Sequence, residues 1–555
     1  MAEGKPSRNF FWEALLLFVF AFWLLGFHTG DASLWDIDEP NNAQSLKEMI
    51  VHDNFVVPTF NGHLRPDKPI LNYWLMDLGV RLLGMNSWGL RIGSVAMGAL
   101  LVLYLSLALR RLLGERAALL TGLFTATALH SQIIFRAAVP DPLLILWVTI
   151  SLLSYLRGYL YPEERQRDYL ISYGAMALGT LAKGPIAFLL PGLIITVFLL
   201  LRKDLPHLWR QGYLRLGLPL FFLLALPWYL AVGLETHWRW DLLFIEQQNV
   251  GRYTGAMQGH QGPIFYYLLT TFLGLLPWSV FFPQMFAALW GHRQEYFRAR
   301  PELVFLGLWA GIWIVFFSLG ATKLPNYVWE AYPPLLALLA WRIDLALGGL
   351  QSLSARGVVA SLLVLGLVGA TLWVLGTWLV PAQLPPLGSV GYLGLPYLCS
   401  ALLAAFFVYR KNFLGVLGSL GVGAVALTFC LVLLLMPRLD ALKPSVQMGR
   451  MVAQQMGQQR PYAIATWHWW EPSFLFYAGR GAMTVHQLQD PGQEIPTILQ
   501  RTQGPLFLVL PQKDLMELRA KLPATESLKE LYSAYELYSR EPITLVRIAA
   551  KAKVG

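Results

Sequence analysis

The chain has 555 residues, of which 56% are hydrophobic and only 14% are charged. A soluble globular protein carries roughly 25% charged residues, so the composition argues against that class. The formal net charge of +10 does not indicate nucleic-acid binding, because most of the excess Lys and Arg lies in short loops between apolar blocks. Both cysteines, Cys399 and Cys430, lie inside such blocks, which argues against a disulfide framework and a cysteine metal site.

The apolar blocks are long enough to cross the hydrocarbon core of a bilayer, about 30 Å thick, as helices. Lipid offers the backbone no hydrogen-bond partners, so each crossing segment has to be helical. The sequence predicts thirteen spans, at 10–27, 88–109, 115–134, 142–160, 168–182, 184–201, 214–233, 263–290, 302–320, 330–348, 357–380, 391–409 and 413–436. No small-residue cleavage site follows the first span, so we interpret it as a retained helix rather than a cleaved signal.

Basic residues cluster in alternate loops between these spans, and loops of that kind stay in the cytoplasm. The opposite set includes the long loop 28–87 and the loop 234–262, which hold more varied polar side chains. We therefore expect these two loops to face the periplasm of a bacterial inner membrane. An odd number of spans places the carboxyl terminus on the same side.

The chain changes character near residue 437, where charged and polar residues become more frequent. Residues 1–436 are predicted to form a polytopic α-helical membrane domain, and residues 437–555 a small soluble periplasmic α/β domain. Short helix-like and strand-like runs alternate in the second domain. In chain order they are 448–456, 462–466, 506–510, 514–521 and 543–548.

The loop 28–87 begins with an unusual group of acids. Asp36, Asp38 and Glu39 lie within four residues, just beyond a membrane helix, where charge is costly to desolvate. One interpretation is a solvated loop in which the acids favour the first turn of a helix. The other is a site that uses the carboxylates. The acids alone leave both interpretations open.

Further motifs follow in a definite order. The loop contains Asp38-Glu39, the amphipathic stretch Ala43 to Val51, the turn Val57 to Gly62, Asp67-Lys68-Pro69 and Tyr73-Trp74. Later motifs are Asp141, Lys183-Gly184-Pro185, Arg252-Tyr253, His260 and Lys323-Leu324-Pro325-Asn326-Tyr327. This order resembles the superfamily of protein O-mannosyltransferases and aminoarabinose transferases, which has the GT-C fold. The thirteen spans and the α/β tail are also similar to an aminoarabinose transferase.

The resemblance implies an inverting glycosyltransferase. Such an enzyme moves one sugar from a polyprenyl-phosphate donor, such as undecaprenyl phosphate, to a periplasm-facing acceptor, which is lipid A, another glycolipid or a protein. In the family the first acid of the Asp-Glu pair is the general base, which here is Asp38, and Glu39 completes the pair. Asp141 matches the second acidic position of the family. The alternative for Asp141 is a helix cap.

A leaving phosphate is stabilised by fixed positive charge, so cations on the predicted periplasmic side are candidates to bind it. The first candidate is Lys68, which lies on the motif loop. The further candidates for binding the lipid phosphate are Lys183, Arg252, Lys323 and Tyr327. Each cation has the alternative of a helix-end residue whose stem covers apolar surface. A tyrosine at a membrane interface is likewise commonplace.

A divalent metal ion is the one cofactor that the residues suggest. Asp67 and His260 carry ligand types suited to such an ion near the lipid phosphate, with a hydrogen-bonded loop histidine as the alternative. In the predicted tail, Trp467 to Glu471 holds three tryptophans around a histidine. Three roles are open for these rings: they stack on sugars, anchor the domain to the bilayer, or fill its core.

Two other functions compete with a single-sugar transferase. A polyprenyl-linked lipid flippase or transporter would also have many spans, but here the polar motifs crowd into the predicted periplasmic loops and no two halves look alike. An oligosaccharide ligase would share the lipid carrier and transfer a whole glycan. The sequence leaves open which sugar is moved and which acceptor receives it.

Overall fold

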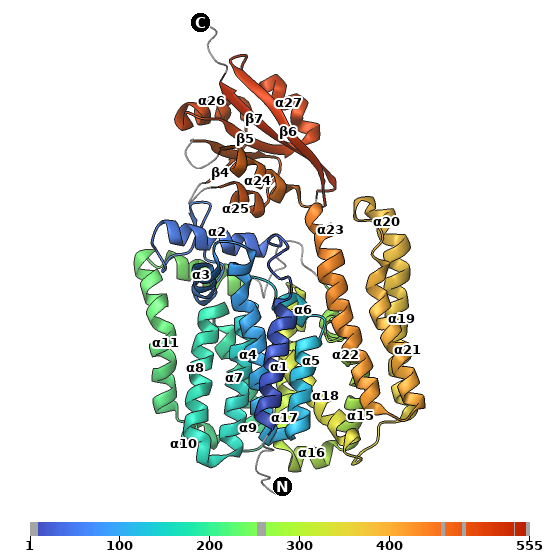
Figure 1. The fold of residues 1–555 in the computed structure, drawn as a ribbon. Coiled ribbons are helices and arrows are strands. Elements are labelled where there is room, and N and C mark those ends of the chain that lie inside the picture. Colours follow the sequence, from blue (N-terminus) through green and yellow to red (C-terminus); the bar gives the residue numbers. More distant parts are fainter. Residues whose placement is uncertain (1–8, 252–261, 457–460, 480–483, 538, 551–555) are drawn as a thin grey trace.

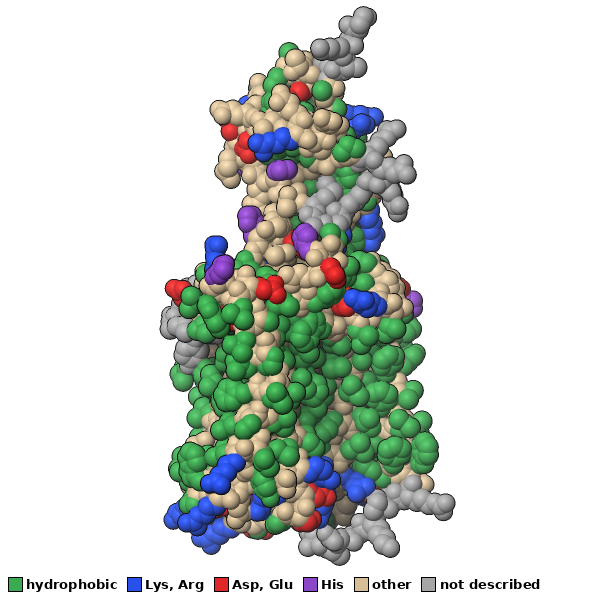
Figure 2. Space-filling model, turned by 90° about the vertical axis from the view of Figure 1, so that its left-hand side faces the viewer, with side chains coloured by type: hydrophobic (Ala, Val, Ile, Leu, Met, Phe, Trp, Pro, Cys, Tyr) green, Lys and Arg blue, Asp and Glu red, His purple; other side chains and the backbone are tan. Residues whose placement is uncertain are grey.

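A computed structural model describes residues 9–251, 262–456, 461–479, 484–537 and 539–550. The chain forms a bundle of long helices with a small domain of strands and helices on one end (Figure 1). We call the end of the bundle that carries this C-terminal domain the tail side. The opposite end is called the basic side, because Lys and Arg side chains gather there below a broad hydrophobic belt (Figure 2).

Each predicted span coincides with a helical segment. These segments are α1 (Phe10–Gly26), α4 (Ser87–Leu113), α5 (Glu115–Thr127), α7 (Asp141–Leu160), α8 (Arg165–Lys183), α9 (Ile186–Leu201), α11 (Leu214–Glu235), α14 (Tyr266–Gly274) with α15 (Phe282–Gly291), α17 (Pro301–Leu319), α18 (Tyr332–Leu347), α19 (Ala355–Val374), α21 (Leu395–Tyr409) and α22 (Phe413–Phe429). In the described part of the chain, seven helices are long and apolar enough to cross a membrane, and one bent pair makes up to eight. The predicted multi-pass helical membrane fold is confirmed.

Two predicted spans have a different shape from a single helix. The span 263–290 breaks into α14 and a second helical segment, which are bent by 113°. Pro277 lies at the break, and proline cannot donate a helical hydrogen bond. The span 115–134 ends early, because the amides of Leu129 and His130 donate to carbonyls at this break, at 3.1 and 2.9 Å. The carbonyl groups left free where the span 263–290 breaks thus accept hydrogen bonds from the residues just after α5, and α5 ends there.

The loop 28–87 is largely folded rather than irregular. The predicted amphipathic stretch lies in α2 (Asp38–Val51), which begins earlier than predicted and runs across the tail side of the bundle (Figure 1). A short hairpin of β1 (Thr59–Phe60) and β2 (His63–Leu64) follows, and then α3 (Leu71–Leu83). Close packing fixes α3 on α4, since a Cβ atom on Gly79 would lie 2.1 Å from the carbonyl oxygen of Gly89.

The C-terminal domain contains one five-stranded sheet with the order β4-β3-β5-β7-β6. Strands β3, β4 and β5 are parallel, whereas β6 and β7 form an antiparallel hairpin along the edge of β5. The strands are β3 (Ala463–Trp467), β4 (Val485–Leu488), β5 (Leu506–Pro511), β6 (Glu526–Glu536) and β7 (Glu541–Ala550). The helices of the domain are α24 (Pro444–Met456), α25 (Pro472–Ala478), α26 (Pro491–Thr502) and α27 (Leu515–Lys521). The small α/β domain inferred from the sequence is therefore present.

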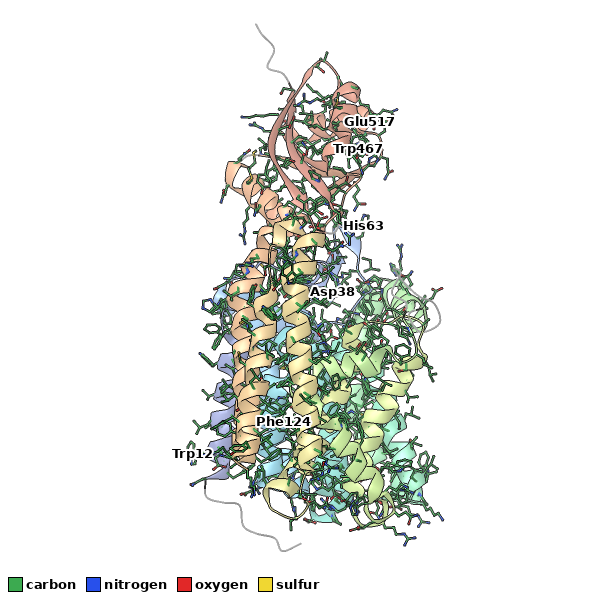
Figure 3. All side chains as sticks on the ribbon, turned by 90° about the vertical axis from the view of Figure 1, so that its right-hand side faces the viewer. Trp12, Asp38, His63, Phe124, Trp467 and Glu517 are labelled. Atoms are coloured by element: carbon green, nitrogen blue, oxygen red, sulfur yellow. The ribbon has the colours of Figure 1, made fainter. Side chains whose placement is uncertain are left out.

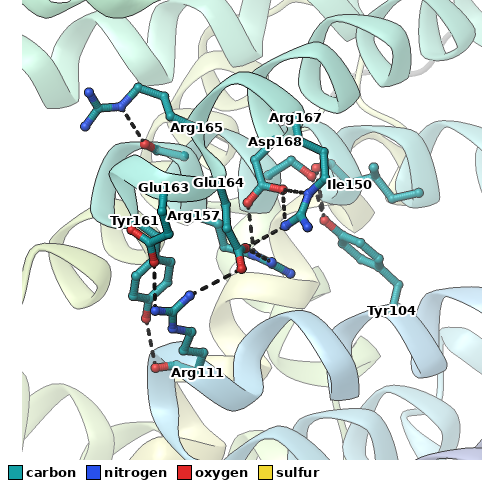
Figure 4. Close-up of polar contacts among 12 residues, drawn as sticks. Tyr104, Arg111, Ile150, Arg157, Tyr161, Glu163, Glu164, Arg165, Arg167 and Asp168 are labelled. Carbon is teal, nitrogen blue, oxygen red and sulfur yellow. Dashed lines mark hydrogen bonds and ion pairs between the residues drawn. The ribbon is translucent and has the colours of Figure 1, made fainter. Parts of the chain in front are cut away.

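Ion pairs hold the helix ends together on the basic side (Figure 4). Glu164 accepts from Arg157 and Arg167 at 2.7 and 2.6 Å and lies 3.4 Å from Arg111 at the end of α4. Arg157 also lies 3.3 Å from Asp168, which is buried in α8. The turn between α7 and α8 is thereby fastened to α4 by arginines whose charge is balanced by carboxylates.

The C-terminal domain is docked on the loop 28–87 by hydrogen bonds between segments far apart in the chain. Lys47 donates to the carbonyl oxygens of Phe476 and Gly479, at 3.1 and 2.6 Å. The Asn61 side chain pairs with the backbone of Val485, accepting from its amide at 2.7 Å and donating to its carbonyl at 3.3 Å. These contacts join α2 and the hairpin turn to α25 and β4.

Buried carboxyl groups lie in the same interface. Asp36 accepts a hydrogen bond of 3.2 Å from the Ser473 amide, and burial raises its pKa from 3.8 to about 6 against the opposing charge of Lys443. Burial and the charge of Asp36 raise the pKa of Glu471 from 4.5 to about 8, with Glu536 adding to the effect. Among the described residues, one oxygen of each of Asp36 and Glu471 has no hydrogen-bond partner.

We expect the docked tail to lose stability as pH rises. A carboxyl group whose folded pKa exceeds its unfolded value binds more protons in the folded state. Its favourable contribution is complete below the unfolded values of 3.8 and 4.5 and is lost as pH passes the folded values near 6 and 8. Thermal unfolding of the purified full chain between pH 5 and 8 measures the slope, which is at most about 1.4 kcal/mol per pH unit for one proton.

The Glu471→Gln variant removes the group with the higher folded pKa. It should flatten the slope above pH 6 and be more stable than the parent chain at pH 8. Glu517→Gln is the control, because Glu517 lies on α27 away from the bundle (Figure 3). An unchanged slope in Glu471→Gln would contradict the assignment of this pH dependence to the interface.

Candidate active site

Glu39 is fully buried and fastens the first turn of α2. Its carboxylate accepts from the Arg91 guanidinium at 2.8 and 2.6 Å, and from the amides of Trp35 and Ala138 at 2.6 and 2.7 Å. Burial alone would raise the pKa of Glu39, but Arg91 and the two amides hold it below its usual value. Both oxygens of the predicted catalytic residue Glu39 are therefore occupied by protein donors.

Arg91 extends this anchor into the preceding segment. It lies in α4 and also donates to the carbonyl oxygens of Thr29, Ala32 and Ser33, at 2.7, 2.9 and 2.8 Å. One guanidinium thus holds both the chain that leaves α1 and the start of α2. Arg91 was not predicted as a site residue, although a single charge inside the predicted span 88–109 is a signal of function or of a buried partner.

Asp38, the residue before Glu39, has the opposite environment. It is the first residue of α2 and is exposed, and its carboxylate makes no hydrogen bond or ion pair with other residues that the structure describes. Figure 3 shows it at the boundary between the bundle and the C-terminal domain. The start of a helix favours a negative charge. Because Glu39 is locked, the backbone of Asp38 is held in place while its carboxylate stays accessible.

A second group forms around Asp141, the first residue of α7. One oxygen of this buried carboxylate accepts from Lys183 at 2.7 Å and from Asn326 at 2.9 Å. The Lys183 ammonium lies 5.6 Å from the centre of the Tyr327 ring. The start of α7, the end of α8 and the short helix η4 (Pro325–Ala331) thus bring three predicted site residues together. Asn326 lies in a motif noted in the sequence, but its contact was not predicted.

The two groups are linked through Ala138, three residues before Asp141. The Ala138 amide donates to Glu39, and its carbonyl oxygen accepts from the Asn42 side chain at 3.0 Å. The segment that leads into α7 is therefore hydrogen-bonded to α2. Consequently, the Asp-Glu pair and the Asp141 group belong to one neighbourhood of the tail side.

The segment with Lys68 is held by buried Arg65. Arg65 donates to the Asn42 side chain at 3.1 Å and to Asp67 at 3.3 Å. The other oxygen of Asp67 accepts from Gln248 at 3.0 Å. Lys68 is half-buried and follows Asp67 directly. The segment therefore lies between α2 and the π-helical stretch η2 (Phe244–Gly251).

The Asn61-Gly62 turn has a structural cause. Asn61 and Gly62 have φ angles of 53° and 74°, in the left-handed region that Asn and Gly tolerate best. Buried Glu48 accepts from the Thr59 hydroxyl at 2.7 Å and from the Asn61 amide at 2.8 Å. The turn thus shapes the hairpin that contacts the C-terminal domain, and Glu48 was not recognised from the sequence.

The remaining predicted phosphate ligands differ in their placement. Lys323 is buried, and its ammonium donates to the carbonyl oxygens of Phe317, Ser318 and Gly320 at 3.0, 2.5 and 2.6 Å. This is the geometry of a cation capping the end of α17. Arg252 lies outside the described residues, so its role stays a prediction.

Of the two residues predicted to bind a metal ion, the structure describes only Asp67. His260 lies outside the described residues, and both oxygens of Asp67 accept hydrogen bonds from Arg65 and Gln248. Within the described ranges, no group of three or more His, Cys, Asp or Glu side chains is arranged to hold a metal ion. The pairing of Asp67 with His260 therefore stays a prediction.

The tryptophan-rich segment fills the tail domain and its interface. Trp467 is 1% exposed and belongs to the core of the sheet, so it cannot stack on a sugar. Trp469 and Trp470 pack against a second core cluster, and Trp470 meets the Phe60 ring edge-on. His468 is exposed and lies 2.9 Å from Asp514. The core-filling interpretation accounts for Trp467 directly.

Comparisons with known proteins show what the chain is similar to. The family model described as dolichyl-phosphate-mannose-protein mannosyltransferase matches residues 67–230. An undecaprenyl phosphate-alpha-4-amino-4-deoxy-L-arabinose arabinosyl transferase of Aeromonas salmonicida is 31% identical over 63% of this chain and 65% of its own. Its counterpart in Pseudomonas aeruginosa is 32% identical over 64% of this chain and 63% of its own. The matches thus span a little less than two thirds of these relatives.

A similarity in three dimensions covers nearly the whole chain. The crystal structure of ArnT from Cupriavidus metallidurans bound to undecaprenyl phosphate aligns with a TM-score of 0.77 at 23% identity, over 97% of this chain and 98% of that one. The apo form of the same protein aligns with a TM-score of 0.74 at 22% identity, over 96% and 97% of the two chains. The chain has the fold of ArnT, and its resemblance to the superfamily of protein O-mannosyltransferases and aminoarabinose transferases is confirmed.

Proposed function

We propose that the chain is an inverting glycosyltransferase that moves one sugar from a polyprenyl-phosphate donor to an acceptor on the tail side. The observation that carries the proposal is the exposed Asp38 carboxylate, held next to the buried Glu39–Arg91 pair. The arabinosyl transfer named for the Aeromonas and Pseudomonas relatives supports the reaction class. The undecaprenyl phosphate bound to ArnT, which has the same fold, supports the carrier.

The reaction is a single displacement at the anomeric carbon. The acceptor hydroxyl attacks from the face opposite the carrier phosphate, and Asp38 takes its proton. The carbon–oxygen bond to the phosphate breaks, and the phosphate leaves with the bonding electrons. Configuration at the sugar is inverted because one bond forms as the other breaks. If the acceptor oxygen already belongs to a phosphate, no proton has to be removed and Asp38 orients the acceptor.

Lys68 is our choice for the cation that stabilises the leaving phosphate. Charge on the phosphate grows as the bond breaks, so a fixed ammonium there favours the transition state. The charge of Lys183 is already shared with Asp141, so we assign it to positioning Asp141. Lys323 caps a helix end, and we give it a supporting role. Arg252 and Tyr327 remain further proposed ligands of the lipid phosphate.

We infer that the active site faces the periplasm from a bacterial inner membrane. The basic side chains lie at the end of the bundle opposite the C-terminal domain (Figure 2), and such residues mark the cytoplasmic side. The acceptor is then a periplasm-facing glycolipid, such as lipid A, or a protein. A divalent ion at Asp67 and His260 is a further part of the proposal, and it would neutralise charge on the lipid phosphate.

Substituting the two neighbouring acids should separate catalysis from structure. Asp38→Asn keeps the shape and removes the basicity, so it should reduce turnover by roughly 100-fold to 10,000-fold at an unchanged unfolding temperature. Glu39→Gln leaves the Arg91 charge unbalanced and should destabilise the protein by about 3–5 kcal/mol. Release of free polyprenyl phosphate measures turnover. Normal turnover of a folded Asp38→Asn variant would rule out Asp38 as the base.

Lys68→Ala should lower turnover of the polyprenyl-phosphate sugar more than it weakens donor binding. A charge-assisted hydrogen bond to phosphate is roughly twice as strong as a neutral one, and it matters most in the transition state. Lys68→Arg should restore activity only in part, because a planar fork replaces a compact charge. The control is Lys529→Ala, an exposed residue of β6. Equal losses in the two alanine variants, or a donor that crosses vesicles with its sugar–phosphate bond whole, would overturn the proposal.

The orientation can be tested by labelling single cysteines in a variant without Cys399 and Cys430. A cysteine at His63 lies on the tail side (Figure 3), and a cysteine at Arg356 lies at the start of α19 on the basic side; both positions are exposed. A membrane-impermeant maleimide should label only the first in intact spheroplasts and both after lysis. The reverse pattern would place the site in the cytoplasm.

A further inference from the structure

An open cavity of about 470 Å³ lies on the basic side, far from the candidate active site. It is bounded by α15, by the end of α18 and by the loop that leads into α19. Its polar wall consists of Gln284, His292, Arg342, Gln351, Ser352 and Ser354. The proposed transferase reaction on the tail side assigns no role to this cavity, so its chemistry has to be explained separately.

Arg342 is a buried cation in the cavity wall without a balancing acid. Its side chain is only 6% exposed. It donates to the carbonyl oxygens of Gln351 and Ser352, at 3.0 and 2.9 Å, and its Nε has no hydrogen-bond partner. No carboxylate lies within ion-pair distance of it among the residues that the structure describes. A buried guanidinium with donors to spare favours a bound anion.

Other arginines of the basic side are paired with carboxylates. Arg111 and Arg157 are paired with Glu163 and Glu164 (Figure 4), and Arg116 lies 3.3 Å from Asp344 near the end of α18. Arg342, two residues before Asp344, lacks such a partner. The unbalanced charge is thus a local property of the cavity and not of the whole basic side.

The start of α19 adds partial positive charge at the rim. Ser354 caps this 20-residue helix by accepting from the Gly357 amide at 2.8 Å. The first amides of a helix carry partial positive charge and favour anions, phosphate in particular. Arg342 and this helix start therefore present positive potential to the same cavity.

Gln284 indicates a second feature of the ligand. Its Nε2 donates to the Ser361 hydroxyl at 3.2 Å, and that hydroxyl in turn donates to the Val280 carbonyl at 2.6 Å. Because the Ser361 hydroxyl uses its proton on Val280, the Gln284 atom that meets it has to be the amide nitrogen. The Gln284 Oε1 is therefore left as an acceptor. This Oε1 is buried and has no donor among the described residues. A complementary ligand would carry both an anionic group and a hydroxyl or amine.

The helices that bound the cavity also expose large apolar side chains. Phe286 and Trp290 on α15 are 51% and 71% exposed, and Leu363 on α19 is 68% exposed. Side chains of this kind face the hydrocarbon region and its interface in a membrane protein. A ligand with a polar head in the cavity would therefore have its apolar part beside these residues.

We propose that this cavity binds the headgroup of an anionic phospholipid from the leaflet on the basic side. The phosphate is held by Arg342 and the first amides of α19, and a headgroup hydroxyl donates to Gln284. Phosphatidylglycerol has this combination of a phosphodiester and hydroxyl donors. The bound lipid would join α15, α18 and α19, none of which shares a carboxylate–arginine pair across the cavity in the described part of the chain.

The experiment uses the purified full chain in detergent with phosphatidylglycerol added, and native mass spectrometry counts the bound lipid. Arg342→Gln should weaken binding roughly tenfold or more, the effect of losing about 1.4 kcal/mol. The matched control is Arg410→Gln, because Arg410 is exposed just after the end of α21 on the same side and the substitution removes the same charge. Arg410→Gln should bind like the parent chain.

Arg342→Gln also removes two hydrogen bonds to the loop, so a second variant keeps the conclusion independent of folding. Ala287→Trp places a large side chain in the cavity from α15 and leaves Arg342 and its two hydrogen bonds unsubstituted, and it should weaken binding as well. Equal weakening by Arg410→Gln, or unchanged binding in Ala287→Trp, would overturn the site. Inorganic phosphate at the lipid concentration should not displace the lipid. If it does, the site is one for free phosphate and the lipid assignment is wrong.

Discussion

The buried ion pair of Glu39 and Arg91 is the interaction on which the tail side depends. A charged pair is expensive to bury unless hydrogen bonds satisfy its remaining donors and acceptors, and here they do. Glu39 receives four hydrogen bonds, two of them from Arg91, and Arg91 also reaches three carbonyl oxygens of the segment before α2. The pair therefore joins the end of α1, the start of α2, the span α4 and the segment that leads into α7.

Adjacent residues of a helix point in different directions, and this difference gives the two acids different surroundings. Glu39 points inward and is bonded to buried protein groups, while Asp38 points outward and its carboxylate is accessible. A similar division occurs among the cations. Lys183 is bound to Asp141 at the start of α7, and Lys323 is bound to carbonyl oxygens at the end of α17. The candidate site is thus a small exposed surface supported by a larger number of buried polar contacts.

Much of the fold could be predicted from the sequence, because long apolar segments have only one stable form in lipid. The positions of the helices and of three tail strands followed from this and from local patterns. The break near Pro277 and the early end of α5 could not be predicted, since they depend on each other through backbone contacts. The partners Arg91, Asn326 and Glu48 were missed for the same reason: each binds a group from another segment, and spacing along the chain says nothing of such pairs.

The contacts between the loop 28–87 and the C-terminal domain also bear on how the protein is made. Asn61 bonds to Val485, and Leu34 to the Tyr477 hydroxyl, across separations of 424 and 443 residues. A ribosome that synthesises the chain releases the loop 28–87 more than 400 residues before the segments to which it bonds, by the separations of 424 and 443 residues. The loop therefore lacks its hydrogen bonds to the C-terminal domain until nearly the whole bundle has been inserted. These contacts can form only after the C-terminal domain has been made, so a chain that stops short of Tyr477 lacks both of them.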